Sequence, residues 1–555
     1  MAMVTATVNM GSDKHNGNFH KIVIISYVLS LSSGMVFIQD ALAFDWRVRP
    51  NLTMSEIFTD NIAFSDTAKK SGFITEVSPG LSLYGVSPWS NFNLNYRLQG
   101  LYNAGGGEAI DFNNQLQMNG LYQVVQNRFF VETSSSISQQ NTSNTYIATD
   151  NLTGSGDRAE NRNFSISPYW TPRFGQYATG LFRVGYQKSS FDNANTEGNS
   201  DNTLAISDSD NLTKQASLSS GSKFNQVRWN LNYSSQNQSR ATGQNQSGTA
   251  DNNDVTFEQY QGDLRYYVNR KFNVFAQTGY ENNDYQTEND SIQNGFFYTV
   301  GGQWSPSKWY SLEAGYGNNK HVGVTFNPSA NFFGHVTYRN KDVGLNTGNS
   351  WDANIHYRGQ QAVVDFNYSQ ETTTVQQILQ KQAIFNLSDQ FGNPILDPVT
   401  KQQQQFIINI PNLVDDVIIS KQANLSLGYQ TGKSSYNLSV YNTRRTYELS
   451  PQEENVYGVS GGWRWQMAPR LNLYLNPTWQ TIDNPSEDSS NSNDRYDVAL
   501  GLIRSIPINL GRPLLMNTGL ELRHISQTSN GANVDNNFSS DYTENRATAN
   551  FAVQF

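Results

Sequence analysis

Hydrophobic and polar residues alternate with a period of two along most of this chain. The C-terminal stretch shows the pattern most plainly, because one side of its extended backbone carries Ala547, Ala549, Phe551, Val553 and Phe555. The same alternation recurs over residues 92–102, 227–234, 262–269, 457–467 and 471–480. A helix would need apolar residues three and four positions apart, so the pattern predicts strands with one apolar face and one polar face.

Short polar links alternate with long polar connections between these segments. Ten short links lie near positions 88, 126, 173, 224, 270, 307, 359, 432, 469 and 510, and the long connections span 141–160, 190–211, 239–254, 321–349 and 371–415. Ten hairpins plus a strand at each end give about 22 strands, with a range of 18–24, and place both termini on one side. In the connection 321–349, residues 332–339 form either a hairpin within a loop or two further strands.

This regular punctuation predicts the fold class. Residues 44–555 are expected to form an all-β, transmembrane, up-and-down antiparallel β-barrel with short periplasmic turns and long external loops. The alternative is a soluble all-β solenoid or tandem sandwich, whose inner faces need Val, Leu and Ile. Aromatic belts at two lipid interfaces explain why tryptophans gather near segment ends, and a soluble fold does not. These tryptophans are Trp46, Trp89, Trp170, Trp304, Trp309, Trp351 and Trp479.

Residues 1–43 have the pattern of a secretory signal peptide. Lys14 and Lys21 precede the apolar run Ile22–Ile38, and Ala41-Leu42-Ala43 supplies an A-x-A cleavage site after Ala43. A single membrane-anchoring helix is the alternative, but the run has only 17 residues and contains four serines and a glycine. The expected location is the outer membrane of a Gram-negative bacterium, with membrane lipid and the barrel-assembly machinery as partners.

Composition excludes several kinds of chemistry. The 555 residues include no cysteine, which rules out disulfides, thiol catalysis and Cys-based metal sites. The net charge of −9 and the absence of a basic face argue against a nucleic-acid partner. Residues Gly428–Ser434 imitate a phosphate-binding loop but are one residue short and join two strands. We expect no cofactor, no metal and no enzymatic activity; a hydrolase at the barrel rim is the third hypothesis for function.

The polar faces of the strands carry the candidate functional residues. If the apolar faces contact lipid, the residues predicted to line the lumen are Arg97, Arg183, Arg228, Arg265, Arg358, Arg464, Arg523, Asp263, Glu313, Asp352, Asp365 and Glu521. One interpretation is that these charges only pair and hydrate the wall. The other is that they create a transverse field, while Tyr, Asn and Gln bind sugar hydroxyls. The connection 371–415, with its apolar stretch Phe406–Pro411, is the predicted plug.

Four histidines follow the predicted signal peptide. His321 and His335 are expected in a loop, His356 in the lumen, and His524 near the outer end of a strand. Their spacing matches no metal site, so we interpret them as ordinary polar residues.

Several short motifs resemble the PEP-CTERM-system-associated outer-membrane protein family. They are Trp46–Leu52, Phe58–Ile62, Phe73–Leu81, Asp416–Lys421, Gly462–Arg470 and Asp541–Arg546, spread over the whole predicted barrel. The resemblance implies a bacterium with an exosortase system, in which such proteins accompany exopolysaccharide biosynthesis and export genes. It implies polysaccharide and periplasmic export components as partners, and carries no catalytic residue.

The combined hypothesis is a non-enzymatic barrel that forms a hydrated pore linked to exopolysaccharide or envelope export. The alternative is a structural or adhesive surface barrel whose Asn- and Ser-rich loops bind external partners. The apolar residues of the last strand, Phe551, Val553 and the terminal Phe555, form the predicted assembly signal.

Overall fold

The alternating segments are strands in the computed structural model. It describes residues 45–104, 110–141, 150–152, 158–193, 206–240, 254–286, 293–384, 415–449, 453–485, 490–509, 511, 513–530 and 541–555. The predicted signal peptide 1–43 and the stretch Phe406–Pro411 lie outside these residues. In the described part, no helix is long and apolar enough to cross a membrane.

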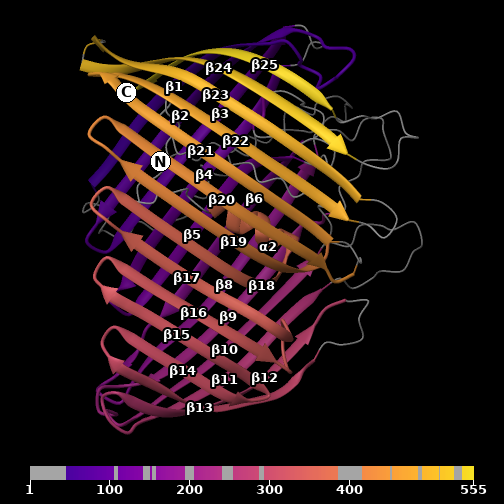
Figure 1. The fold of residues 1–555 in the computed structure, drawn as a ribbon. Helices are drawn as coiled ribbons and strands as arrows, with labels where there is room; N and C mark the ends of the chain where they lie inside the picture. The colour runs from indigo at the N-terminus through magenta and orange to yellow at the C-terminus, as the bar shows by residue number, and fades with distance from the viewer. Residues whose placement is uncertain are drawn as a thin grey trace, which may run out of the picture. The chain divides into compact units, whose positions relative to one another are not determined.

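The strands follow one another as consecutive antiparallel neighbours (Figure 1). Their bounds are Asp45–Thr59 (β1), Gly72–Ser87 (β2), Ser90–Ala104 (β3), Ile110–Val125 (β4), Phe129–Asn141 (β5), Arg158–Trp170 (β6), Arg173–Phe174 (β7), Ala178–Asn193 (β8), Ser209–Ser220 (β9), Val227–Arg240 (β10), Val255–Tyr267 (β11), Phe272–Asp284 (β12), Gly295–Ser307 (β13), Tyr310–Gly317 (β14), Asn319–Ser329 (β15), Phe332–Lys341 (β16), Gly348–Arg358 (β17), Ala362–Thr374 (β18), Val417–Gln430 (β19), Ser434–Tyr447 (β20), Glu453–Ala468 (β21), Leu471–Pro485 (β22), Ser490–Asn509 (β23), Pro513–Asn530 (β24) and Tyr542–Gln554 (β25). Helix α2 (Val375–Ile384) lies between β18 and β19.

The sheet closes on itself through its first and last strands. β1 pairs antiparallel with β25, from Asn51 opposite Gln554 to Thr59 opposite Arg546. The Phe555 amide donates a further hydrogen bond to the Pro50 carbonyl, at 2.8 Å. The two-residue strand β7 pairs only with β8, which leaves 24 strands in the ring. Closure removes both edges and gives every strand two hydrogen-bonded neighbours.

The expected strand number of about 22 is two short, although 24 lies within the expected range. The difference arises in residues 321–349, which were treated as one long connection. They contain most of β15 and all of β16, joined by the short link Ala330-Asn331. Asn318 alone separates β14 from β15, so the rule that long connections mark one end of the barrel fails there.

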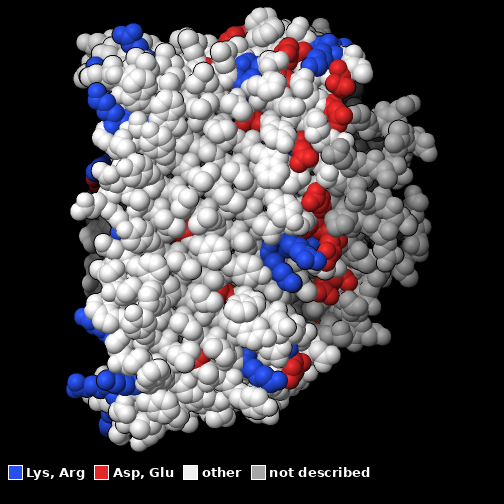
Figure 2. Space-filling view, viewed as in Figure 1, with Lys and Arg blue, Asp and Glu red and all other residues white. Residues whose placement is uncertain are grey.

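The outer face of the barrel is apolar and nearly free of charge. On β12, the outward Phe272, Val274, Ala276 and Tyr280 are exposed, whereas the intervening Asn273, Phe275 and Glu281 are buried. Phe272 and Tyr280 lie eight positions apart, about 26 Å along a strand, comparable with an apolar membrane band of about 25 Å. The face seen in Figure 2 has few charged residues over its middle.

Charged residues gather at the two rims of this band (Figure 2). Short turns at one rim contribute Arg128, Arg173, Lys223, Lys308 and Lys433, and Asp and Glu gather at the other. The ammonium groups of Lys223 and Lys308 lie 4.4 Å from the ring centroids of Tyr177 and Trp309, respectively. Cations over exposed rings are typical of the interface between lipid and water.

Candidate functional site: the barrel interior

The inner wall is polar, and most of the predicted lumen residues have partners on it. Arg265 brings together three of them, with Asp263 at 3.7 Å and Glu313 at 2.8 Å. Apart from Asp365, which bonds the predicted lumen residue His356, the others contact residues that the sequence did not single out. Arg97 bonds Gln115 at 2.9 Å, Arg183 pairs with Glu132 at 2.8 Å, Asp365 bonds His356 at 2.5 Å, Glu521 accepts from Tyr474, and Arg523 pairs with Asp497 and Asp150.

The other four of the twelve predicted lumen residues take part in none of these pairs. The Arg228 guanidinium lies 5.0 Å from the centroid of the Tyr267 ring. Arg358 and Asp352 lie on β17 in the same alternation as His356, and Arg464 lies on β21 in the same alternation as the buried Glu454. The twelve residues therefore line several parts of the wall and do not form one cluster.

Aromatic rings on the inner wall lie flat over glycines of the neighbouring strand. Tyr474 is directly opposite Gly501, Tyr441 opposite Gly458, Phe275 opposite Gly301 and Phe297 opposite Gly279. A Cβ added at any of these glycines would stand 2.2–2.6 Å from the facing ring. Glycine thus makes room for rings that would otherwise project into the lumen.

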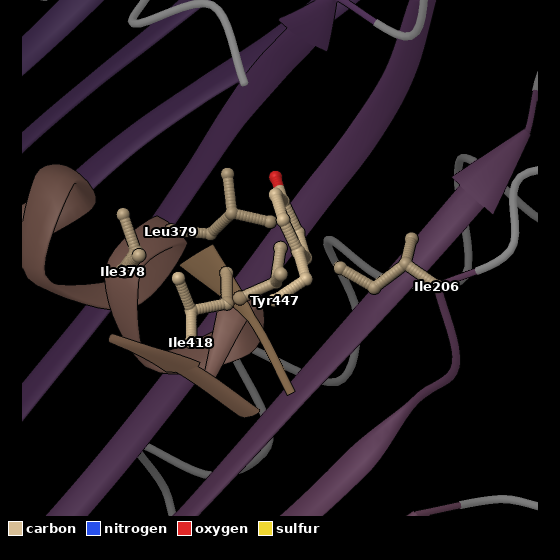
Figure 3. Packing of buried hydrophobic residues seen from close by; sticks show 6 residues of the cluster. Ile206, Ile378, Leu379, Ile418 and Tyr447 are labelled. Atoms are coloured by element: carbon tan, nitrogen blue, oxygen red, sulfur yellow. The ribbon is translucent and has the colours of Figure 1, made fainter. Parts of the chain in front are cut away.

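Helix α2 crosses the interior. It leaves β18 and contacts β5, which lies twelve places away in the ring of 24 strands and therefore on the opposite wall. Figure 1 shows α2 behind the near strands. Its residues Val375, Ile378 and Leu379 are buried in a cluster with Ile418 and Tyr447 of the wall and with Ile206, which precedes β9 (Figure 3).

Polar contacts fix the two ends of this connection to β10. The Thr374 hydroxyl donates to Gln238 at 2.9 Å, directly before α2. Asp415, two residues before β19, accepts hydrogen bonds on its carboxylate from Gln376 at 2.5 Å and from the Ser207 amide at 3.0 Å. Its backbone carbonyl accepts one from Arg240 at 2.9 Å. α2 is therefore held by an apolar cluster and by a polar network.

Residues 150–152, the described part of the connection between β5 and β6, also contact the inner wall. Asp150 pairs with Arg546 at 2.6 Å and with Arg523 at 3.0 Å, both on the last two strands. Leu152 packs against Ile57, Ile62, Ile74 and Leu101 of the wall at β1–β3. Burial alone would raise the pKa of the Asp150 carboxyl, but the two guanidinium groups hold that pKa well below its ordinary value.

A third connection, between β16 and β17, bonds to β12. The Leu345 amide donates to the Glu281 carboxylate at 3.0 Å, and the Gly344 amide donates to the Gln293 carbonyl at 2.7 Å. All three connections belong to the end of the barrel opposite the short turns. Their described residues contact the inner wall at that end, and the helix that crosses the interior belongs to the connection 371–415.

The structure corrects the placement of two histidines. His321 lies on β15 and His335 on β16, both on the inner wall and not in a loop. They were misplaced because 321–349 was treated as one connection. His356 bonds the Asp365 carboxylate as part of the inner wall, and His524 on β24 bonds Asn545 at 2.8 Å. Among the described residues, no group of His, Asp and Glu could hold a metal ion.

Sequence reasoning placed the connection 371–415 inside the barrel, but it missed the helix α2 and the contacts of Asp150 and Asp415. A signal for the helix was present, because Val375, Ile378 and Leu379 are spaced three and four apart within a polar connection. Asp150 and Asp415 had no such signal. Their role depends on which arginine or amide the folded connection reaches.

These features define a class of protein. A closed antiparallel barrel of 24 strands, with an apolar outer band and a polar inner wall, is an outer-membrane β-barrel.

No family model and no curated protein matches the chain. Solved structures that resemble it include the FrpB iron transporter from Neisseria meningitidis (F5-1 variant), with 10% identity over 91% of this chain and 82% of that one and a TM-score of 0.44. A mutant of the ferric enterobactin receptor PfeA from Pseudomonas aeruginosa has 9% identity over 92% and 80%, with a TM-score of 0.41. OmpT of Vibrio cholerae has 9% identity over 59% and 98%, with a TM-score of 0.24.

Proposed function

We propose that this barrel is a non-enzymatic, hydrated outer-membrane pore that passes polar solutes and is constricted by its own inward-folded connections. The observation that carries the proposal is helix α2, which crosses a polar interior from β18 to the opposite strand β5. A wall of ion pairs and neutral polar side chains favours a hydrated path. The crossing helix limits the size of solute that can use it.

We also propose a solute and a biological system for this pore. The sequence resemblance supports a role in exopolysaccharide or envelope export in a PEP-CTERM and exosortase system. Movement would then be passive or driven by periplasmic export components, with polysaccharide as the solute. Loss of the gene should retain polysaccharide in the periplasm, while normal secretion would argue against this cargo.

Recording currents across planar bilayers tests the pore directly. The purified chain should give a stable, modest conductance. Deleting Gln376–Gln405 should raise this conductance several-fold, because it removes α2 and most of the connection. A second variant keeps the length and replaces Val375–Ile384 with Gly and Ser, which removes the contacts of α2 without shortening the connection. An unchanged conductance in both variants would show that α2 does not constrict the path.

The second candidate function is a closed structural or adhesive platform, whose long connections bind external partners. The buried cluster around Leu379 favours it, because an apolar contact in the interior also suits a permanently closed barrel. Under this alternative the chain and both variants stay silent in the bilayer, and loss of the gene reduces surface adhesion without affecting secretion.

A further inference from the structure

The inner wall at β11–β16 contains a recess that the ion-pair network does not fill. Its volume is about 260 Å³, and it is lined by side chains from six consecutive strands. Ligand pockets usually measure about 300–1,000 Å³, so this recess suits a single small ring. It lies on the wall of the path proposed above, where a passing solute can enter it.

Glycines keep the recess open. The Phe275 ring packs over Gly301, and the His321 ring packs over Gly315, so both rings lie against the wall. Their centroids are 5.5 Å apart and the rings are nearly parallel, at 24°. Gly323 lines the recess without a side chain. A larger residue at these glycines would push rings or methyl groups into the space.

Two groups of polar contacts fix the shape of the recess. Glu313 accepts hydrogen bonds from Arg265 at 2.8 Å and contacts His321 Nε2 at 3.1 Å. His335 lies between the hydroxyls of Thr325 and Thr337, each at 2.9 Å from a ring nitrogen. Because these side chains hold one another, the walls are set before a ligand arrives.

Three further side chains line the recess with groups still available to a ligand. Within the described residues, Gln277 and Arg339 form no side-chain hydrogen bond with the protein, and Asp263 has only its 3.7 Å ion pair with Arg265. A carboxylate, a carboxamide and a guanidinium thus border one small space. Each can form two hydrogen bonds with neighbouring hydroxyl groups.

The charges at the recess balance. Asp263 and Glu313 offset Arg265 and Arg339, so a ligand with a net charge gains little electrostatically. The acidic and histidine residues form no group that could hold a metal, as far as the described residues extend. The lining is mostly polar, which disfavours an apolar ligand. A neutral molecule with many hydroxyl groups remains as the best match.

We infer that this recess is a binding site for one neutral sugar ring of a glycan chain. The inference rests on the proposed pore and adds the chemistry of its solute. Asp263, Gln277 and Arg339 bind the hydroxyl groups, and Glu313 positions Arg265 and His321 behind them. Weak binding at such a site lets a solute enter the path and leave it again.

Block of the pore current by maltohexaose, a neutral oligosaccharide, tests the inference. Wild-type current should be blocked in a concentration-dependent way, and an oligogalacturonate of equal length, which is anionic, should block less. The double variant Asp263→Asn with Gln277→Leu should raise the blocking constant for maltohexaose by about tenfold, equivalent to one or two lost hydrogen bonds. The control Asn424→Leu lies on β19, away from the recess, and should leave conductance and block unchanged.

Two results would overturn the site: equal block of the wild type and the double variant, or stronger block by the anionic oligomer. If the wild type carries no current, the pore itself fails, and the site is then tested by calorimetry of the detergent-solubilised barrel. Binding of maltohexaose that the double variant weakens would uphold the site without the pore. Absence of binding would reject it.

Discussion

The ring of Tyr474 on β22 lies across Gly501 on β23, and its hydroxyl group donates to Glu521 on β24. The three residues are in register across three strands. A Cβ at position 501 would stand 2.2 Å from Tyr474 Cζ. The glycine therefore lets one ring connect a strand with its second neighbour while the ring stays out of the lumen.

Gly501→Ala should destabilise the barrel by about 1–3 kcal/mol, because the ring must move and its bond to Glu521 is lost. The urea midpoint of the folded, heat-modifiable form measures this. Gly432→Ala is the matched control, since a Cβ there meets nothing within 4 Å. Equal midpoints for the two variants would mean that the ring does not depend on the glycine.

Leu379→Ala should loosen α2 without unfolding the barrel. Leu379 is 2% exposed within the apolar cluster, and truncating a buried Leu costs about 2–5 kcal/mol. The substitution weakens the contact between α2 and the inner wall and leaves the strands intact. Single-channel records should therefore show more frequent large openings of the pore. Leu231→Ala, on the lipid face and 52% exposed, is the control and should keep the wild-type record. Identical single-channel records for the two variants would contradict the hypothesis that α2 constricts the pore.

The Asp150 contact should resist acid and fail only at low pH. Arg546 and Arg523 hold the pKa of Asp150 below that of an unfolded Asp, which is about 3.9. A depressed folded pKa means that the contact stabilises the fold at pH values above about 4, and that this contribution is lost as pH falls through the folded pKa.

The thermal midpoint of Asp150→Asn, compared with wild type at each pH, measures this effect. The difference should be full from pH ~5 to 7, shrink as the pH falls below about 4, and be lost as the pH falls through the folded pKa. Asp66→Asn removes an exposed carboxylate and is the control, expected to match the wild type throughout. If the difference is already lost at pH ~5, the two guanidinium groups do not lower the pKa of Asp150.

Alternation along the sequence predicted the strands because lipid and water impose opposite demands on the two faces of each strand. The predicted barrel must close through its first and last strands, and the β1–β25 register shows this closure. The rule based on link length failed at β14–β16, because Asn318 alone joins β14 to β15 at the end of the barrel that carries the long connections. A link this short can occur at either end of the barrel, so its length does not show at which end it lies.

The interior was harder to predict than the wall. Alternation assigns Arg265 and Glu313 to one face, but they lie on β11 and β14, and only register and curvature bring them within 2.8 Å. The inward connections lack any period of two. Their places depend on buried partners such as Arg546 for Asp150 and Gln238 for Thr374, which are far away in the sequence.

Leu520→Arg tests whether the apolar face contacts lipid. Leu520 is 64% exposed near the middle of β24, opposite Leu502 and Ala549. An arginine at the middle of a membrane costs about 2–4 kcal/mol in a barrel of this kind, so the variant should lower the folding midpoint in phospholipid vesicles by that amount. Asn517→Arg, on the other face of the same strand, should cost much less. A similar cost for both would argue that no lipid covers Leu520.

Deleting Phe555 should impair assembly more than conduction. Its amide forms the hydrogen bond to Pro50 that ends the seam between β1 and β25, and Phe551 on the same strand is 50% exposed on the lipid face. Without this hydrogen bond and the Phe555 side chain, β25 pairs less stably with β1. It also presents a shorter apolar C-terminus to the barrel-assembly machinery. The membrane-inserted, heat-modifiable fraction should therefore fall, while the molecules that do close should keep the wild-type unit conductance.

Gln554→Ala keeps the terminal Phe and the backbone bond, so it should assemble normally. Normal yield from the deletion would show that the closure of this barrel is set elsewhere along the seam.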